Sequence, residues 1–324
     1  MICPITNTSY AAAILEKYRS FLMELRHLRY FIAVAEEGSL SNAAVRRLHT
    51  AQPSLSRQIR DLELEVGVKL LERRPRGITL TPAGRVFLDH ARMALLQVET
   101  ASEAARRAEQ PDKPAFVIGF LTGQEVTLLP ETLRILREEA PDVEITFVSL
   151  TSPQLALSLM RGKVDVAFMR RETQTTGLAY KLLIKEPLLV VLPASHRLAG
   201  TKPIQPQELA REIFIGVARA APAVRAVIHE YAKKVGITLK ASYEGDNLPA
   251  IMSLVTSTGG LALCPFYVKN QLTPRLVTCP LKGEAPTVDL VLGYNRSNTS
   301  PWLKRFLFRA DELVHNVQKQ ISLK

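Results

Sequence analysis

The sequence predicts an all-α N-terminal part, a long connecting helix and a C-terminal α/β part built of two lobes. Apolar residues recur mainly at helical spacing as far as residue 110. After a polar hinge at residues 111–114, short apolar runs typical of strands alternate with amphipathic helices. The chain of 324 residues is too long for one ordinary domain, and its 47% hydrophobic content is typical of a globular protein with several cores.

The composition limits the classes of function. A formal net charge of +11 favours a polyanionic partner. No run approaches the about 18 consecutive apolar residues that a membrane-spanning helix needs. The three cysteines, Cys3, Cys264 and Cys279, form neither a disulfide framework nor a metal-binding pattern. We therefore expect a cytoplasmic protein that has no membrane contact, metal or cofactor.

The first 22 residues differ from the rest of the N-terminal part. They lack the basic start and the apolar run of a secretion signal. Met23 then opens a strongly patterned segment. We expect residues 1–22 to be a leader that either lies upstream of the principal start at Met23 or frays, and we expect the first domain to cover residues 23–81.

Three helices are expected in this domain. The pattern of residues 25–37 predicts the first, and Gly38 ends it. Residues 39–49 predict a second, short helix. A third follows, which Thr50 is expected to cap and which carries Pro53 in its first turn, where a missing amide hydrogen costs no intrahelical bond.

The two faces of the third helix differ in character. At 100° per residue its apolar side chains share a narrow arc and predict a buried stripe. The opposite face is basic, and between Gly38 and Arg60 there are four arginines and no acid. Two short helices followed by a third with an outward basic face predict a helix-turn-helix, although an exposed solvated helix is the alternative. The expected buried residues are Leu55, Ile59 and Leu62, and the expected outward residues are Pro53, Arg57 and Arg60.

A basic hairpin is expected after the third helix. Residues 72–81 carry Arg73, Arg74 and Arg76 close to a turn at Gly77. In this position the segment reads as a wing, whose arginines bind phosphates or enter the minor groove. The N-terminal domain is therefore expected to be a winged helix-turn-helix.

A long helix is expected over residues 82–110, capped by Thr81 and begun by Pro82. At 1.5 Å per residue it would be about 40 Å long. Apolar residues, most of them alanine, recur along it in steps of four and three, which predicts a seam between two helices of a dimer. The alternative is a helix packed on its own domain. The seam consists of Phe87, Ala91, Ala94, Val98, Ala101, Ala105 and Ala108.

These motifs resemble the winged helix-turn-helix of LysR-type transcriptional regulators. The resemblance rests on MELRHLRYFIAVAEEGSLSNAA, AQPSLSRQIRDLE and GVKLLERRPRGITLTPAG, and it extends over the chain from Met23. It implies a dimer, and beyond it a homotetramer, on an inverted-repeat site in double-stranded DNA, with RNA polymerase as a further partner. By this likeness the DNA-facing residues are Gln52, Pro53, Ser54, Ser56, Arg57, Arg73, Arg74 and Arg76, and the outward position of Arg60 adds that residue to them.

The chain departs from the family at one point. The family pattern A-A-x-x-L is A-A-V-R-R-L here, with one extra residue. We expect the extra residue in the loop after Gly38, with Ala44–Val45 in the two alanine positions. Val45 would then crowd a site normally filled by a methyl group.

The C-terminal part, residues 111–324, shows a βαβαβ rhythm that implies a parallel sheet with right-handed crossovers. A second series of strands and helices follows. Two α/β lobes with two crossings of the chain predict a periplasmic-binding-protein-like clamshell, which binds a small ligand in its cleft. Lobe I is expected over residues 115–187 and 288–319, and lobe II over 188–287.

The resemblance extends to the ligand. The C-terminal segments look most like regulators of aromatic-compound catabolism that respond to phenylpropionate, benzoate or muconate, which implies an aromatic or dicarboxylic acid as effector. Thr151–Ser152 is also a helix cap in any protein, Arg170 could meet a neighbouring acid instead, and Phe266 could be core. The expected cleft residues are Thr122, Gly123, Gln124, Thr151, Ser152, Arg170, Gly216, Val217, Arg219, Asn247, Pro265 and Phe266.

No catalytic constellation is present in the sequence. The motifs GxGxxG, GxxxxGK[ST], HExxH and GxSxG are absent, His196 reads as part of a surface turn, and Cys264 as a small buried hydrophobe. We expect a non-enzymatic, sequence-specific DNA-binding regulator that a small molecule controls. The alternatives are an architectural DNA-binding protein without sequence choice and a ligand-transforming enzyme with an accessory DNA-binding domain.

Overall fold

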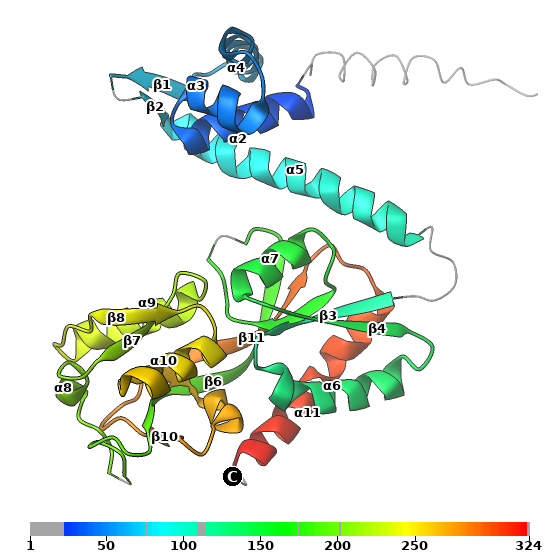
Figure 1. Ribbon diagram of the computed structural model, residues 1–324. Helices are drawn as coiled ribbons and strands as arrows, with labels where there is room; N and C mark the ends of the chain where they lie inside the picture. Colours follow the sequence, from blue (N-terminus) through cyan, green and yellow to red (C-terminus); the bar gives the residue numbers. More distant parts are fainter. Residues whose placement is uncertain (1–22, 76, 109–114, 174, 201, 323–324) are drawn as a thin grey trace, which may run out of the picture. The chain divides into compact units, whose positions relative to one another are not determined.

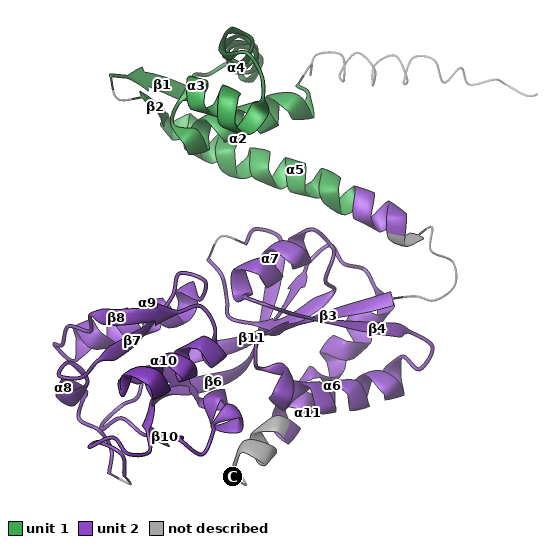
Figure 2. Ribbon diagram, in the orientation of Figure 1, with its two compact units in different colours: residues 1–101 green, residues 102–324 purple. Residues whose placement is uncertain are grey.

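The computed structural model describes residues 23–75, 77–108, 115–173, 175–200 and 202–322. The chain divides into two compact units, residues 1–101 and 102–324 (Figure 2). The expected leader, Arg76 and the hinge at 111–114 lie outside the described residues.

The first unit is a small helical domain with a two-stranded hairpin (Figure 1). Its core is formed by side chains such as Phe31, Leu55 and Leu62, which have no exposed surface. Phe31 and Phe87 meet edge to face with ring centroids 5.1 Å apart. The elements that begin in this unit are α2 (Leu25–Glu37), α3 (Leu40–Asn42), η1 (Ala43–Leu48), α4 (Gln52–Val66), β1 (Leu71–Arg74), β2 (Gly77–Leu80) and α5 (Pro82–Ala108), and the last turns of α5 belong to the second unit.

The extra residue of the A-A-V-R-R-L segment lies inside the second helix, so its expected place in the preceding loop is wrong. Ala43 and Ala44 are fully buried, whereas Val45 is 69% exposed. The second helix accommodates the additional residue in a π-helical stretch, η1, which is followed by the C-cap residue His49 with a positive φ of 47°. A wide turn is the physical solution because it keeps both alanines in the core and keeps the larger Val45 out of it.

The ends of the next helices are only partly as expected. The N-cap residue of α4 is Ala51, with no side-chain hydrogen bond, so the expected cap by Thr50 is wrong. The cap of α5 is confirmed, since Thr81 Oγ1 accepts a hydrogen bond of 2.8 Å from the Gly84 amide.

The seam of α5 has two parts. Ala91 belongs to the core of its own unit and Phe87 packs against that core, so there the alternative reading holds. Farther along the helix, Ala94, Ala101 and Ala105 lie at the surface. Only this second part of α5 can form a seam with another helix in a dimer.

The second unit is built on one sheet of nine described strands in the order β4-β3-β5-β11-β6-β9-β7-β8, with β10 paired to β6 (Figure 1). Strand β6 pairs with β11 as far as Pro187 and with β9 from Leu188, so it passes from one lobe to the other. The strands are β3 (Ala115–Leu121), β4 (Glu144–Leu150), β5 (Val166–Met169), β6 (Leu178–Pro193), β7 (Phe214–Val217), β8 (Ala241–Gly245), β9 (Leu261–Pro265), β10 (Leu276–Cys279) and β11 (Thr287–Asn295).

Both lobes cover their part of the sheet with helices, as the α/β rhythm predicts. Strand β3 runs parallel to β4 and β5, whereas β11 runs antiparallel to β5 and β6. The sequence analysis did not predict β10, α8, η2 or the first half of β6. The helices are α6 (Glu125–Glu139), α7 (Ser152–Met160) and α11 (Pro301–Ser322) in lobe I, and α8 (Pro206–Leu209), α9 (Pro222–Lys234), α10 (Leu248–Thr258) and the 3₁₀-helix η2 (Phe266–Gln271) in lobe II.

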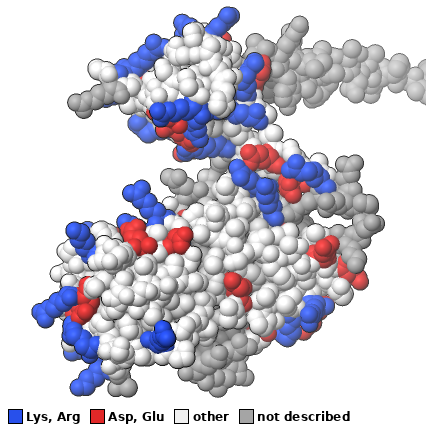
Figure 3. Space-filling model, in the orientation of Figure 1, with Lys and Arg blue, Asp and Glu red and all other residues white. Residues whose placement is uncertain are grey.

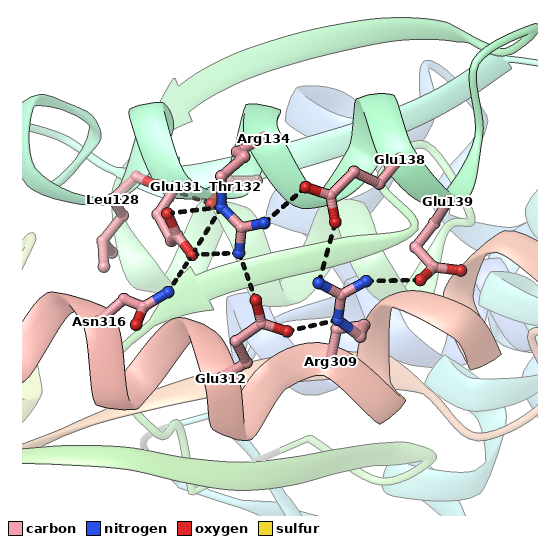
Figure 4. Close-up of polar contacts among 9 residues, drawn as sticks. All are labelled: Leu128, Glu131, Thr132, Arg134, Glu138, Glu139, Arg309, Glu312 and Asn316. Carbon is pink, nitrogen blue, oxygen red and sulfur yellow. Dashed lines mark hydrogen bonds and ion pairs between the residues drawn. The ribbon is translucent and has the colours of Figure 1, made fainter.

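An ion-pair network joins α6 to α11 (Figure 4). The Arg309 guanidinium donates to Glu138 at 3.0 Å, to Glu139 at 2.7 Å and to Glu312 at 2.5 Å. Arg134 donates to Glu138 at 2.6 Å and also to Glu312. The network therefore links the N-terminal and C-terminal helices of lobe I, which are far apart in the sequence.

The network should make stability depend on pH. The hydrogen bonds from Arg309 and Arg134 lower the pKa of Glu312 to about 2 from 4.5. A carboxyl whose pKa is lower in the folded state stabilises the fold above its unfolded pKa, and this stabilisation is lost as pH falls toward 2. An Arg309→Met variant should therefore melt below the parent at pH 7, with a smaller difference at pH 3. Lys304→Met, exposed on the same helix, is the control, and an equal difference at both pH values would contradict the prediction.

Candidate DNA-binding face and ligand cleft

Helix α4 presents the two faces that its sequence predicts. Leu55, Ile59 and Leu62 are buried in the core of the first unit. Arg57 and Arg60 are exposed on the other side. Of the remaining candidates on α4, Pro53 and Ser54 are exposed, and Gln52 and Ser56 are half-buried. Side chains suited to contact DNA thus project from one face of a helix whose other face is anchored.

The wing is fixed to the end of the first helix by a close backbone approach. The Ile78 amide donates a hydrogen bond of 2.7 Å to the Gly38 carbonyl. A Cβ atom on Gly77 would lie 2.6 Å from the same carbonyl oxygen, and Gly77 has φ 132°. Only glycine fits this position without displacing the hairpin.

A buried acid on α4 also holds the wing. Glu63 is 7% exposed and accepts hydrogen bonds from the Leu70 amide at 2.9 Å and the Leu71 amide at 3.1 Å. Its other oxygen lies 2.6 Å from Lys69 Nζ. Burial alone would raise the pKa of Glu63, but Lys69 and the two amides outweigh burial and hold the pKa below its usual value. The available sequence signal is that Glu63 lies one helical turn after the buried Ile59.

One arginine of the wing, Arg73, contacts α4. Arg73 Nη2 donates to Ser56 Oγ at 3.2 Å, which brings two of the predicted DNA-facing residues together. Arg74 pairs with Glu72 at 3.0 Å, and Arg57 Nε lies 3.9 Å from Asp61 Oδ2. All three arginine side chains are largely exposed, and Lys and Arg side chains spread over the visible surface of this unit (Figure 3). The surface suits a polyanion.

The second unit has a cleft between its two lobes. Seven of the twelve predicted cleft residues line it: Thr122, Thr151, Ser152, Arg170, Val217, Asn247 and Pro265. Lobe I contributes the ends of β3 and β5 and the start of α7, and lobe II contributes the starts of α9 and α10 and the end of β9. The carboxyl ends of parallel strands and the amino ends of helices are the usual place for ligands in such sheets.

Three helix N-termini meet at the cleft. Thr151 forms a capping box on α7, and the Asn247 side chain accepts a hydrogen bond of 2.9 Å from the Ala250 amide on α10. The N-cap residue of helix α9, Ala221, makes no side-chain cap hydrogen bond, and residues 220–224 all line the cleft. Free amides at a helix start carry a partial positive charge that favours an anion.

Arg170 is the most deeply buried charge at the cleft. It is 1% exposed, and its Nη2 lies 2.5 Å from Glu186 Oε2, so it does meet a neighbouring acid. Its Nε and Nη1 atoms are buried and have no hydrogen-bond partner among the described residues. Its guanidinium also lies 5.9 Å from the Tyr267 ring centroid. An unsatisfied buried donor costs about 1–3 kcal/mol, and a ligand oxygen could satisfy it.

The other predicted cleft residues lie elsewhere. The Gly123 carbonyl accepts a hydrogen bond of 2.6 Å from Gln271 Nε2, and the Gln124 amide donates to both oxygens of Glu186, at 3.3 and 3.2 Å. Gly216 lines a different hollow beside β8 and α9. Arg219 and Phe266 do not line the cleft, where Tyr267 lies instead.

Several lining residues were missed from the sequence. The most polar of these are Glu172 and Asp246, and most of the others are apolar and come from the first turns of α9 and α10. These residues could have been found from the positions at which helices begin after strands, namely at Pro222 and Leu248.

Two further expectations concern His196 and Cys264. His196 does lie in a turn, but its side chain is largely covered and its Nε2 is 3.3 Å from Glu212 Oε2, so it is no free surface residue. Cys264 is confirmed as a buried residue of β9, and burial raises the pKa of its thiol to about 12.

Comparisons with known proteins identify both domains. Residues 25–85 match the model of the bacterial regulatory helix-turn-helix protein, lysR family, and residues 109–312 match the LysR substrate binding domain. The chain belongs to the LysR family. It is a transcriptional regulator with a DNA-binding domain and an effector-binding domain.

Named relatives of this LysR-family chain are similar over nearly its whole length. The Hca operon transcriptional activator HcaR of Escherichia coli is 38% identical over 300 residues, which cover 91% of this chain and 99% of the relative. The regulator CatR of Pseudomonas putida is 32% identical over 286 residues, 88% of this chain and 97% of the relative. These relatives are named as regulators, which indicates a role other than catalysis.

Solved structures of the LysR family share the fold. Full-length BenM is 26% identical with a TM-score of 0.56, covering 92% of this chain and 97% of that chain. Full-length CbnR, solved with its target DNA, is 26% identical with a TM-score of 0.54, covering 90% of this chain and 100% of that chain. Within the described residues, no helix of this chain is long and apolar enough to cross a membrane.

Proposed function

We propose that an aromatic or dicarboxylic acid occupies the interlobe cleft of this LysR-family regulator and controls its binding to an inverted-repeat promoter site. The observation that carries this proposal is Arg170, a fully buried cation at the cleft with two unsatisfied nitrogen donors. The uncapped start of α9 adds free amides at the same wall. Both features suit a carboxylate.

The walls of the cleft suit the rest of such a ligand. Val217, Val224, Ile251 and Leu263 give it an apolar lining. Apolar walls with a few fixed polar groups are typical of small-molecule sites. An aromatic ring or a short unsaturated chain would remove this surface from water, while the carboxylate meets the polar wall.

On the DNA side, Arg57 and Gln52 would read base edges in the major groove, and Arg73 and Arg74 would contact phosphates or the minor groove. The surface alanines of α5 supply a seam for a dimer, and a pair of dimers would form the tetramer that the family resemblance implies. Binding of the effector can change DNA affinity only if it favours one arrangement of the domains, and DNA must then change effector affinity by the same factor.

A thermal-shift screen of the full-length protein tests the effector site. Benzoate, 3-phenylpropionate and cis,cis-muconate are the probes. At least one should raise the melting temperature, because a ligand that binds the folded state stabilises it by mass action. The shift should be largely lost in Thr151→Ala, which removes the hydroxyl at the start of α7.

The matched control is Thr256→Ala on α10, which does not line the cleft and whose hydroxyl donates to the Met252 carbonyl. It should retain the full shift. If no organic acid stabilises the parent protein, or if both variants respond alike, the cleft as proposed is not the effector site.

A further inference from the structure

Glu172 places an unpaired carboxylate at the cleft. It follows β5 in lobe I and lines the cleft together with Arg170. Its Oε1 atom is buried and has no hydrogen-bond partner among the described residues. Burial raises the pKa of Glu172. A buried acceptor without a donor is costly unless a ligand supplies one.

Acidic side chains outnumber basic ones at the cleft. Arg170 is the one Lys or Arg among the described lining residues, and Glu186 already pairs with it at 2.5 Å. Glu172 and Asp246 add two acids to the lining. One carboxylate on a ligand can use the remaining donors of Arg170 and the start of α9. A second carboxylate has no such partner, and it would lose its water in a site that already holds an unpaired Glu172.

We infer that Glu172 selects the effector: the cleft takes an aromatic acid with one carboxylate and one hydroxyl or amino group that donates a hydrogen bond to Glu172, and it rejects dicarboxylic acids. This inference rests on the proposed function and narrows it. A site with an unpaired buried acceptor discriminates strongly, because an analogue without the donor leaves that acceptor unsatisfied. A hydroxyl that meets Glu172 should improve the dissociation constant by about tenfold or more over the same acid without it.

Calorimetric titration of the full-length protein with matched acids tests the inference. The probes are benzoate, its three monohydroxy and three monoamino derivatives, isophthalate, terephthalate and cis,cis-muconate. At least one hydroxy or amino acid should bind about tenfold more tightly than benzoate, and the dicarboxylates should bind more weakly than benzoate. Glu172→Leu should remove the advantage of the donor. Glu172→Gln, which keeps an acceptor but loses the charge, should improve dicarboxylate binding.

Glu230→Gln is the matched control, since Glu230 is exposed on α9 and does not line the cleft. It should bind every probe as the parent does. If benzoate binds but dicarboxylates bind as well as the best donor acid, or if neither Glu172 variant changes the order of the probes, the inference fails and the proposed effector site stands. If no acid binds the parent at all, both the inference and the proposed carboxylate site fail.

Discussion

Replacing Arg57 by alanine is expected to lower affinity for the cognate DNA site by about 10- to 100-fold, because one bidentate contact to a base is worth about 1–3 kcal/mol. The Arg57 side chain is 78% exposed on α4, and its nearest acid, Asp61, is 3.9 Å away, so little in the protein competes for it. Affinity for unrelated DNA should fall much less. The cognate site is obtained by selection from random duplexes, and fluorescence anisotropy at fixed salt then gives both affinities.

Arg74→Ala is the matched control for this prediction. Arg74 lies on the wing strand β1, where a phosphate contact carries no sequence information. Its loss should weaken binding to cognate and unrelated DNA alike and reduce the slope of affinity against salt by about one. Equal losses on both DNAs for Arg57→Ala would refute its role in base reading. A selection that returns no motif would instead favour an architectural protein.

The sequence predicts the order of most elements in this chain because their periodicities are local. The buried arc of α4 follows from the spacing of Leu55, Ile59 and Leu62 alone. The strands β3, β4 and β11 follow from apolar runs between turn residues. The first half of β6 has no such run, since buried, partly buried and exposed residues are mixed along the part that pairs with β11. Its existence depends on a partner about a hundred residues away, which no local pattern reveals.

The extra residue of the second helix shows a different limit. A loop insertion and a wide helical turn are both compatible with A-A-V-R-R-L. The outcome depends on which side chains the core can hold, and the core takes Ala43 and Ala44 and leaves Val45 in solvent. That comparison needs the packing of α2 and α4 around the second helix, which one sequence does not contain.

The sequence located both candidate sites, but it did not identify the buried acidic residues in them. The family resemblance identified Thr122, Thr151 and Asn247, and each of them lies where a strand is followed by a helix. Glu172 and Glu63 read as ordinary surface acids, since each becomes buried only when another part of the fold covers it. Glu63 is covered by the wing, whose Leu70 amide donates a hydrogen bond to it, and Glu172 lies at the cleft, which residues of both lobes line.

Replacing Glu63 by alanine should have the largest effect on the stability of the first unit. The change leaves the buried Leu70 amide and its neighbour Leu71 without acceptors and removes the partner of Lys69. The free energy of unfolding of this unit should fall by on the order of 3 kcal/mol. Hydrogen exchange at Leu70 and Leu71 should accelerate before that of the α4 core, since these two amides lose their bonds directly.

The same substitution should weaken binding to all DNA sequences, because it releases the wing that carries Arg73 and Arg74 from α4. Glu63→Gln keeps an oxygen acceptor and loses only the ion pair, so it should lie between alanine and the parent in both stability and affinity. Asp89→Ala, exposed on α5, controls for the loss of one acid from this basic unit. If Glu63→Ala and Asp89→Ala show the same hydrogen exchange at Leu70 and Leu71 and the same DNA affinity, Glu63 does not position the wing. If hydrogen exchange accelerates in Glu63→Ala while DNA affinity is unchanged, Glu63 only stabilises the unit.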